Sequence, residues 1–329
     1  MNNKILSISV ASYNVEKFIQ QAIDSYLNCN CKEKIEVLIV NDGSTDRTEQ
    51  IVKKYIEQYP NIIKLINQEN AGPGSTVNTG LKNATGKYFR MIDGDDWVKS
   101  DEMDSYIDFL EKHEIDMVVT NFIKVDDKTG QQELQQLNFN FDYNKEYHFD
   151  DICNDLELNM HNITYKTSLI KNNLKLDNCF YTDTEYLLFP MKDITTVAFL
   201  KNYIYMYRVS LDSQSVNINS LQKHCDMHET VLSRLINFYK MNSNSFSESR
   251  KKYIATRIAA MVGTQLYIYL SYNPSDEYKL KIKKMLKELK ENNKDIYNII
   301  AKKKTVKLLK ISNYAMYGFV SNKIRKNNN

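Results

Sequence analysis

The first hundred residues alternate between short apolar runs and segments with helical periodicity. The runs contain no Gly or Pro and lie at Ile5–Val10, Ile35–Val40, Ile62–Ile66 and Tyr88–Ile92. In the segments between them, apolar residues recur every three or four positions, which is the period of an amphipathic helix. Because strand and helix alternate four times in about ninety residues, the sequence predicts an α/β fold with a doubly wound, mostly parallel sheet.

The helices between the runs have recognisable ends. The first follows Asn14, which we expect to cap its N-terminus. The second begins near Thr45 and is closed by Pro60, and a third is expected over Thr76–Asn83.

Beyond the fourth run, the pattern continues and then changes. A helix is expected after Ser100, and residues 117–125 predict another strand. Residues 126–151 are polar and rich in Gln and Asn, which favours a hairpin or an excursion lying over the site. Helical pattern begins after Asn219 and continues to the end, with a breaker at Asn273-Pro274.

The fourth apolar run ends in a cluster of acids, Asp93-Gly94-Asp95-Asp96. In open α/β sheets, ligands bind beyond the carboxyl ends of the strands, where these carboxylates are expected. Carboxylates packed so closely repel one another and need a cation, protonation or full solvation. Their oxygens suit a hard divalent ion, Mg²⁺ or Mn²⁺, so the sequence indicates a metal site. The alternative is a solvated acidic turn ahead of the helix near Asp101.

Polar or glycine-rich segments also follow the second and third runs. Asp42 is placed to accept a hydrogen bond from a base or ribose, or to cap the helix beginning near Thr45. Gly72 and Gly74, on either side of Pro73, allow close approach of the backbone to a ligand or form a tight turn. The chain has neither G-x-G-x-x-G after the first run nor G-x-x-x-x-G-K-[ST], so dinucleotide and P-loop interpretations lose their main support.

Cysteine usage and the N-terminus bear on the compartment. The five cysteines include no C-x-x-C pair, which argues against a disulfide scaffold and a zinc site. No apolar signal segment follows Met1, so we expect a reduced, cytoplasmic protein. The longest uncharged stretch, Ile258–Ser275, contains Pro274 and several tyrosines, which favours a buried helix over a transmembrane span. His224 and His228 have the spacing of two metal ligands on a helix, with surface or packing roles as the alternative.

Five segments in the N-terminal two thirds of the chain form an ordered series. They are S-V-A-S-Y-N-x-E at 9–16, E-V-L-I-V-N-D-G-S-T-D at 36–46, N-A-G-P-G at 70–74, N-T-G-L-x-x-A-x-G-x-Y at 78–88 and D-G-D-D-W at 93–97. Together they resemble glycosyltransferase family 2, inverting enzymes of the GT-A fold that use nucleotide sugars. The resemblance implies a GT-A-type, Rossmann-like, doubly wound mixed sheet, followed here by an all-helical C-terminal region.

The resemblance also implies roles for individual residues. It places Ala11, Tyr13 and Asp42 around the uridine. Asp93 and Asp95 correspond to the D-x-D pair that serves the ribose and the metal on the diphosphate. Further candidates for nucleotide binding lie in the same motifs: Glu16, Asn70 and Gly72.

The family places a catalytic acid on a short helix after an extended segment, which matches F-Y-T-D-T-E-Y-L-L-F at residues 180–189. Asp183 is then the general base. Relatives commonly show Glu-Asp where this chain has Thr-Asp, and Glu185 is the reserve candidate. The alternative for Asp183 is an N-cap of a helix beginning at Glu185. The segment Y-M-Y-R-x-x-x-x-S-x-S at 205–215 also resembles the family, and Arg208 or the serines are expected to line the diphosphate or acceptor.

The expected reaction is a metal-dependent, inverting transfer of a sugar from a nucleotide sugar, UDP-sugar being favoured, to a hydroxyl of a cell-surface glycan, teichoic acid or lipid-linked acceptor. Asp183 would take the proton of the attacking hydroxyl. Trp97 offers an apolar face to a sugar or is simply core. Two other classes stay open. A sugar nucleotidyltransferase should show a Gly-rich loop with Arg and Lys where this chain has Ser12-Tyr13-Asn14, and a non-catalytic glycan-binding scaffold would leave the acids spare. No nucleic acid is expected as a partner.

Charge divides the chain unevenly. From Lys251 onward there are 18 basic and 5 acidic residues, and we expect a catalytic domain at 1–215 and a basic helical region at 216–329. Lysines crowd two amphipathic segments, 279–290 and 302–310. Such segments can hold a protein peripherally on the anionic inner face of a membrane. Alternatively, their apolar stripe packs on the catalytic domain or on a second subunit of a homo-oligomer.

Overall fold

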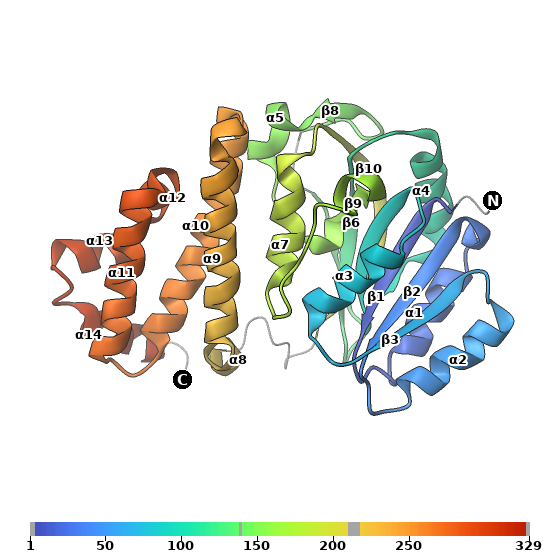
Figure 1. The fold of residues 1–329 in the computed structure, drawn as a ribbon, viewed down its shortest axis with the longest axis horizontal. Helices are drawn as coiled ribbons and strands as arrows, with labels where there is room; N and C mark the ends of the chain where they lie inside the picture. Colours follow the sequence, from blue (N-terminus) through green and yellow to red (C-terminus); the bar gives the residue numbers. More distant parts are fainter. Residues whose placement is uncertain (1–3, 138–139, 210–217, 327–329) are drawn as a thin grey trace. The chain divides into compact units, whose positions relative to one another are not determined.

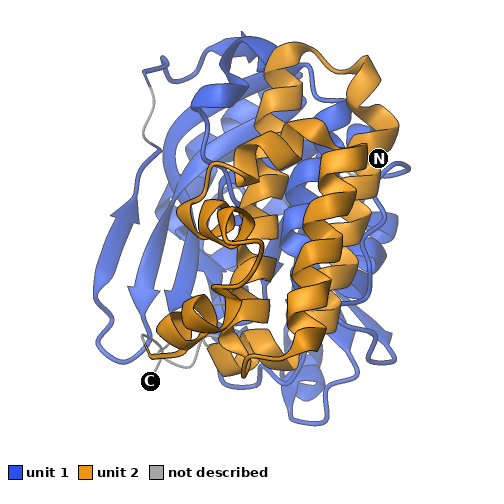
Figure 2. Ribbon diagram, turned by 90° about the vertical axis from the view of Figure 1, so that its left-hand side faces the viewer, with its two compact units in different colours: residues 1–211 blue, residues 212–329 orange. Residues whose placement is uncertain are grey.

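The computed structural model describes most of the chain, namely residues 4–137, 140–209 and 218–326. It divides into two compact units, an N-terminal unit of residues 1–211 and a C-terminal unit of residues 212–329, which Figure 2 colours separately. The domain boundary predicted between residues 215 and 216 lies outside the described residues and stays a prediction.

The N-terminal unit alternates strands and helices. Its strands are β1 (Leu6–Ser12), β2 (Ile35–Asp42), β3 (Ile63–Gln68), β4 (Tyr88–Asp93), β5 (Trp97–Val98), β6 (Met117–Asp126), β7 (Gln132–Gln135), β8 (Glu146–His148), β9 (Ile163–Lys166) and β10 (Thr196–Val209). Its α-helices are α1 (Ile19–Leu27), α2 (Thr48–Gln58), α3 (Pro73–Asn83), α4 (Ser100–Lys112), α5 (Phe149–Ile152), α6 (Thr167–Ile170) and α7 (Thr182–Leu188).

The described strands form one mixed sheet in the order β3-β2-β1-β4-β9-β6-β10-β5, with β7 beside β6 and β8 beside β10. Strands β1 to β4 are parallel to their neighbours among themselves. The chain moves outward from β1 to β3 and then returns past β1 to β4. Because such crossovers are right-handed, α1 and α2 cover one face of the sheet and α3 the other, where α3 packs on β1 and β2 (Figure 1). The predicted doubly wound mixed sheet is confirmed.

The central strands owe their position to continuous apolar sequence. Every residue of β2 is buried, as expected for a parallel strand covered by helices on both faces. The predicted N-cap role of Asn14 is wrong. Asn14 adopts a left-handed φ of 53° and its Oδ1 accepts from the Thr45 amide at 2.8 Å, so the side chain joins two loops and α1 begins only at Ile19.

The polar middle region forms edge strands. β7 pairs antiparallel with β6, and β8 pairs antiparallel with β10, while residues 138 and 139 lie outside the described part. β10 is the longest of the strands that the apolar pattern did not predict. It runs for 14 residues and is parallel to β6 with an irregular register between Phe199 and Tyr205, which interrupts the period-two pattern of an ordinary strand.

The C-terminal unit is helical throughout its described residues. Its α-helices are α8 (Ile218–Lys223), α9 (Cys225–Asn242), α10 (Glu248–Ser271), α11 (Asp276–Asn292), α12 (Lys294–Ile300), α13 (Lys304–Ile311) and α14 (Tyr317–Lys326). The breaker at Asn273-Pro274 separates α10 from α11, as predicted. α10 has buried residues along its whole length, and none of the helices in the described ranges has the length and apolar character that crossing a bilayer requires.

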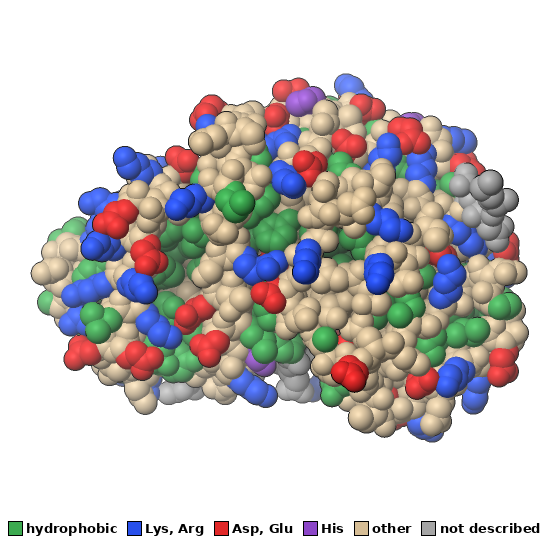
Figure 3. All heavy atoms as spheres, in the orientation of Figure 1, with side chains coloured by type: hydrophobic (Ala, Val, Ile, Leu, Met, Phe, Trp, Pro, Cys, Tyr) green, Lys and Arg blue, Asp and Glu red, His purple; other side chains and the backbone are tan. Residues whose placement is uncertain are grey.

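The apolar stripe of the lysine-rich segments is core. Ile282, Leu286 and Leu289 of α11 and Val306 and Leu309 of α13 are at most 3% exposed, and α11 packs on α10 and α12. The exposed face of α11 carries lysines paired with acids, Lys284 with Glu288 and Lys287 with Glu291, and basic and acidic side chains are intermingled on the face shown in Figure 3. Packing within the helical unit therefore accounts for the stripe, an arrangement that amphipathic sequence alone does not distinguish from membrane or subunit contact.

Candidate functional site

The predicted acids lie where the sheet changes direction. Ala11 of β1 pairs with Asp93 of β4, and Ser12 pairs with Asn41, the neighbour of Asp42. The carboxyl ends of three strands are therefore level. In doubly wound sheets, the crevice beyond such a switch point is the ligand site, so the structure brings Ala11, Asp42 and Asp93 to the expected edge.

The turn D-G-D-D folds back closely over the end of β1. Gly94 is required there, because a Cβ at this residue would lie 2.6 Å from the carbonyl oxygen of Ala11. The Asp96 amide closes the turn on the carbonyl of Asp93 at 3.0 Å. Asp95 stands exposed and Asp96 is 1% exposed, so neighbouring acids of one motif face different surroundings.

Asp96 is held by β10 rather than offered to a ligand. Its Oδ2 accepts from the hydroxyl of Tyr205 at 2.7 Å and its Oδ1 from the amide of Arg208 at 2.7 Å. The same hydroxyl accepts from the Asp93 amide at 3.1 Å. Tyr205 thus clamps two residues of the turn. Sequence reasoning missed this role, and its one available signal was that Tyr205 opens the Y-M-Y-R segment.

Arg208, predicted to line the diphosphate or acceptor, is engaged by protein groups. Its guanidinium lies 4.6 Å from the ring centroid of Phe18 and 4.7 Å from that of Trp97. It donates from Nε to the carbonyl of Asp95 at 2.8 Å and pairs with Asp127 at 2.7 Å. Arg208 therefore supports the D-x-D turn, while a contact with substrate stays a prediction. The serines at 210–217 lie outside the described residues.

Trp97 is partly buried and packs beside the core, while its contact with a sugar stays a prediction. Besides stacking on Arg208, it packs against the apolar cluster of Ile123, Val125 and Met206. A guanidinium over an indole ring contributes about 0.5–2 kcal/mol, depending on desolvation. The Trp that closes the D-G-D-D-W motif thus fixes Arg208.

The acids of the site lie in one another's electric field. Burial, followed by the charges of Asp95 and Asp183, raises the pKa of Asp93 to about 7. Burial, followed by the charge of Asp93, raises the pKa of Asp96 well above its usual range. The pKa of a carboxyl group is raised in this way when other negative charges are close and too little positive charge compensates them. The structure therefore brings Asp183 to the D-x-D turn across ninety residues of sequence.

Asp183 and its reserve candidate Glu185 share α7 but differ in their surroundings. The helix begins at Thr182, after Tyr181 at a left-handed φ of 70°. Asp183 therefore lies in the first turn, and the alternative in which Asp183 caps a helix beginning at Glu185 is wrong. Glu185 is fully buried and its Oε2 accepts from the Asp177 amide at 3.0 Å. That contact gives Glu185 a structural role in shaping the segment before α7.

Asp42 organises the N-A-G-P-G loop. It is 3% exposed, and its carboxylate accepts from Gln68 at 2.6 Å and from the amides of Ala71 and Gly72 at 2.9 Å each. The helix-cap alternative is wrong, because α2 begins at Thr48 and Asp42 faces the loop instead. Contact with a base or ribose stays a prediction.

The glycines of this loop allow another segment of the protein's backbone to approach closely. Gly72 has φ 86°, and a Cβ at Gly74 would overlap the carbonyl oxygen of Asp177. Asn78 on α3 exchanges two hydrogen bonds of 2.9 Å with the backbone of Leu176. The N-A-G-P-G and N-T-G motifs therefore fix the segment that leads to Asp183, a contact that sequence could not reveal.

The remaining candidates lie on loops at the same edge. Tyr13 is 51% exposed and Asn70 is also exposed. Glu16 accepts from the amide and Nε of Arg47 at 3.0 and 3.1 Å. Hydrogen bonds from Arg47 lower the pKa of Glu16, so its carboxylate binds the loop before α2, and a role in nucleotide binding is untested.

A divalent ion fits the chemistry of the D-x-D turn. Asp93 and Asp95 offer hard carboxylate oxygens, and the raised pKa of Asp93 indicates negative charge that a cation would compensate. Mg²⁺ and Mn²⁺ are commonly held by one or two carboxylates, together with waters and substrate phosphates. Among the described residues, clusters of three protein ligand atoms within 4.8 Å occur only elsewhere, so these acids would need ligand oxygens to complete a coordination sphere.

The histidine pair has a packing role. His228 is 3% exposed and bonds through Nδ1 to Gln265, and His224 Nδ1 contacts the carbonyl of Ser220 at 2.9 Å. The cluster of potential metal ligands in this region consists of Cys225, Asp226 and Glu229, without either histidine. The packing alternative accounts for both rings.

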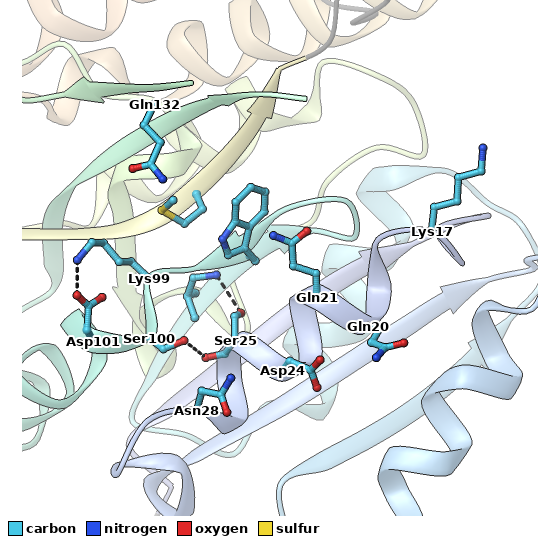
Figure 4. Close-up of a pocket in the computed structure, with 13 residues that line it drawn as sticks. Lys17, Gln20, Gln21, Asp24, Ser25, Asn28, Lys99, Ser100, Asp101 and Gln132 are labelled. Carbon is cyan, nitrogen blue, oxygen red and sulfur yellow. Dashed lines mark hydrogen bonds and ion pairs between the residues drawn. The ribbon is translucent and has the colours of Figure 1, made fainter. Parts of the chain in front are cut away.

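A hollow of about 830 Å³ lies in the N-terminal unit but contains none of the predicted acids (Figure 4). Its wall includes Gln20 and Asp24 of α1, Asn28 just after that helix, and Lys99 and Asp101 at the start of α4. Lysine and carboxylate charges balance along it. We place the candidate active site at the switch point instead, because the perturbed carboxylates gather there.

Known sequences match the N-terminal part of the chain. Residues 7–175 match the family model Glycosyl transferase family 2. The minor teichoic acid biosynthesis protein GgaB of Bacillus subtilis is 36% identical over 135 residues, which are 40% of this chain and 15% of that protein. The glycosyltransferase GlyA of Streptococcus pneumoniae is 34% identical over 125 residues, 38% of this chain and 18% of that protein. The chain thus corresponds to a small part of these longer relatives.

Solved structures share the fold over nearly the whole chain. S. aureus TarS 1–349, in complex with UDP-GlcNAc, has a TM-score of 0.67 at 19% identity and covers 97% of this chain and 92% of its own. Mannosyltransferase PcManGT from Pyrobaculum calidifontis, in complex with GDP-Man and Mn²⁺, has a TM-score of 0.52 at 13% identity, with coverage of 98% and 87%. These likenesses concern the fold alone. Since the family model spans just over half of the sequence, the chain belongs to glycosyl transferase family 2.

Proposed function

We propose that this chain is a metal-dependent, inverting glycosyltransferase that moves a sugar from a UDP-sugar to a hydroxyl of a cell-surface glycan, teichoic acid or lipid-linked acceptor. Family membership supports sugar transfer. The UDP-GlcNAc complex of TarS and the teichoic acid assignment of GgaB support the donor and acceptor classes.

The observation that carries the proposal is the effect of two carboxylates on the pKa of a third at the switch point. Asp93 has its pKa raised to about 7 by burial and by the charges of Asp95 and Asp183. Two of these acids come from one turn and the third from α7, and a cluster built only for stability would avoid such repulsion. In a site that binds a cation, the repelling carboxylates serve as ligands, and the cation also compensates the charge of a diphosphate.

Each acid has a distinct part in the reaction. When bound by Asp93 and Asp95, Mn²⁺ or Mg²⁺ supplies electrostatic stabilisation of the leaving diphosphate. Asp183 accepts the proton of the acceptor hydroxyl as its oxygen bonds to the anomeric carbon. The bond from that carbon to the diphosphate oxygen breaks in the same displacement, which inverts the centre. Asp96, Tyr205 and Arg208 hold the turn in place.

A screen of nucleotide sugars with Mn²⁺ or Mg²⁺ tests the proposal, with release of nucleoside diphosphate as the readout. Asp183→Asn should keep donor affinity and lose transfer by about a hundredfold or more, the size of a general-base contribution. Glu185→Gln tests the reserve candidate, and Asp193→Asn, an exposed carboxylate at the end of the next helical turn, is the matched control.

The outcomes separate the competing classes. Pyrophosphate formation from a nucleoside triphosphate and a sugar phosphate would identify a nucleotidyltransferase instead. Donor binding without turnover across a panel of acceptors would favour a scaffold. Normal turnover in Asp183→Asn would move the base elsewhere.

The metal role has its own measurement. Asp95→Asn removes a charged ligand but keeps the size of the side chain. Calorimetry of UDP binding should show Mn²⁺ dependence in the wild type and its loss in this variant. Unchanged dependence would remove Asp95 from the metal site.

We also propose that the C-terminal helices hold the protein on an anionic membrane surface. Lys307 and Lys310 are exposed beside Ile311, which is 86% exposed, and Phe319 is 60% exposed. Each lysine near an anionic surface contributes about 1 kcal/mol. Co-sedimentation with anionic vesicles at low salt should capture the full chain and not a chain truncated at Asn293. Absence of binding, or binding by the truncated chain, would leave helix packing or oligomerisation as the purpose of the region.

A further inference from the structure

Two thiols and a carboxylate converge at the connection between α1 and β2. Cys29 and Cys31 follow the end of α1, and the Cys31 thiol donates to the sulfur of Cys29 at 3.1 Å. Asp104, on α4, completes a cluster whose potential ligand atoms all lie within 4.8 Å of one another. The C-x-C spacing is outside the C-x-x-C pattern that usually signals a zinc site, so the sequence did not predict it.

The carboxylate of this cluster is oriented by its neighbours. Asp104 Oδ1 accepts from the Cys31 amide at 2.8 Å, and Oδ2 accepts from the side chain of Asn30 at 2.7 Å. The segment is also tied to α4 by the ion pair of Lys34 with Glu111 at 2.6 Å. Such second-sphere contacts fix ligand direction in protein metal sites, and each carboxylate oxygen keeps a lone pair for a cation.

We propose that Cys29, Cys31 and Asp104 bind a thiophilic divalent ion of the Zn²⁺ type, with water as the fourth ligand. Two thiolates and one carboxylate are a donor set that Zn²⁺ accepts in tetrahedral geometry, whereas Mg²⁺ and Mn²⁺ prefer oxygen alone. Zn–S bonds of about 2.3 Å at the tetrahedral angle hold two sulfurs about 3.8 Å apart. The thiols, now 3.1 Å apart, need to separate by less than one ångström as their protons pass to solvent.

The position of the cluster lets an ion enter from solvent and lets the bound ion influence α1. Cys29 is buried, but Cys31 and Asp104 are partly exposed, which provides an entry path. The bound ion would join the end of α1 to α4. Because α1 also carries Gln21, which accepts from Arg208 at 2.7 Å, the ion would rigidify the helix on which the support of the D-x-D turn rests. The site is chemically independent of the hard-ion site at that turn.

Titration of the full chain with Co²⁺, with Mg²⁺ in excess to occupy oxygen-only sites, tests the proposal. Thiolate-to-Co²⁺ charge-transfer absorption should saturate at one equivalent, and Zn²⁺ should abolish it by displacement. Cys31→Ser should weaken binding by about tenfold or more, since loss of a second-sphere partner alone costs about that much. Asn30→Ala removes a hydrogen bond to Asp104 but no ligand, so it should weaken binding by a smaller factor, and it keeps the test valid if the Ser variant fails to fold.

Cys225→Ser is the matched control, because Cys225 belongs to the second cluster of potential ligands among the described residues but contributes only one thiol. It should leave the titration unchanged. Absence of the charge-transfer band, equal strength of the band in Cys31→Ser, or its loss in Cys225→Ser would each overturn the proposal.

Discussion

The clamp on the D-x-D turn can be tested by removing one oxygen atom with Tyr205→Phe. Tyr205 is fully buried, and its hydroxyl donates to Asp96 and accepts from the Asp93 amide. Phenylalanine keeps the ring and its contacts with Arg90 and His161. The variant therefore isolates the two hydrogen bonds.

Their loss can be sized from the surroundings. An intramolecular hydrogen bond contributes about 1 kcal/mol net, and we count the bond to Asp96 at that value. The Asp93 amide is left without an acceptor, which costs about 1–3 kcal/mol more. The free energy of unfolding should fall by about 2–4 kcal/mol. A loosened turn should also weaken Mn²⁺-dependent UDP binding by about ten- to a hundredfold.

Urea denaturation and calorimetry measure the two effects. Tyr203→Phe is the control, since Tyr203 lies on the same strand and is only partly buried, beside the cluster of Ile123, Val125 and Met206. It should change stability by less than about 0.5 kcal/mol, as substitutions away from buried polar networks do. A Tyr205→Phe protein as stable as the control, with unchanged UDP affinity, would refute the clamp.

Two further predictions concern buried titratable groups. Burial and the charge of Arg90 lower the pKa of His161 to about 3, so the unfolded chain binds a proton below pH 6.5 that the folded protein does not. Stability should therefore fall as the pH falls, by about 2 kcal/mol between pH 6.5 and 5, and urea midpoints of His161→Phe should lack this part of the slope. In Asp42→Asn, one of the three donors to this side chain faces an amide NH₂ instead of an acceptor. We expect the free energy of unfolding to fall by about 2 kcal/mol and the amides of residues 70–72 to exchange hydrogen faster. Unchanged exchange would contradict the role of Asp42 in holding the loop.

The sheet and the acids could be predicted because their signals are local. Apolar runs such as Ile35–Val40 mark strands that are buried on both faces, and the topology then decides which ends meet. The D-x-D acids follow directly from a strand end. The resemblance to a family supplied Asp183, and no period or spacing in the chain could have linked it to residues ninety positions earlier.

The supports of the site could not be predicted, because each depends on a distant partner. Asp96 and Tyr205 are 109 residues apart, and Asn78 and Leu176 are 98 apart. A hydrogen bond between residues so far apart in the sequence produces no recognisable pattern in either segment. The irregular register of β10 with β6 also hid the strand that carries Tyr205 and Arg208.

The predicted site residues differ in whether their polar side-chain atoms are already hydrogen-bonded within the protein, a difference that their motifs do not reveal. Asp42 holds a loop with three accepted hydrogen bonds, and Glu185 shapes the approach to α7. Arg208 gives its donors to the turn and to acidic or amide partners. A group so engaged must break protein contacts to bind substrate, which costs about 1–3 kcal/mol for each buried partner left unmet. Asp93 has no such engagement of its carboxylate within the described residues and carries the pKa shift of uncompensated charge. Among these candidates, Asp93 is therefore the residue whose uncompensated charge a bound metal ion, held together with a diphosphate, would stabilise the most.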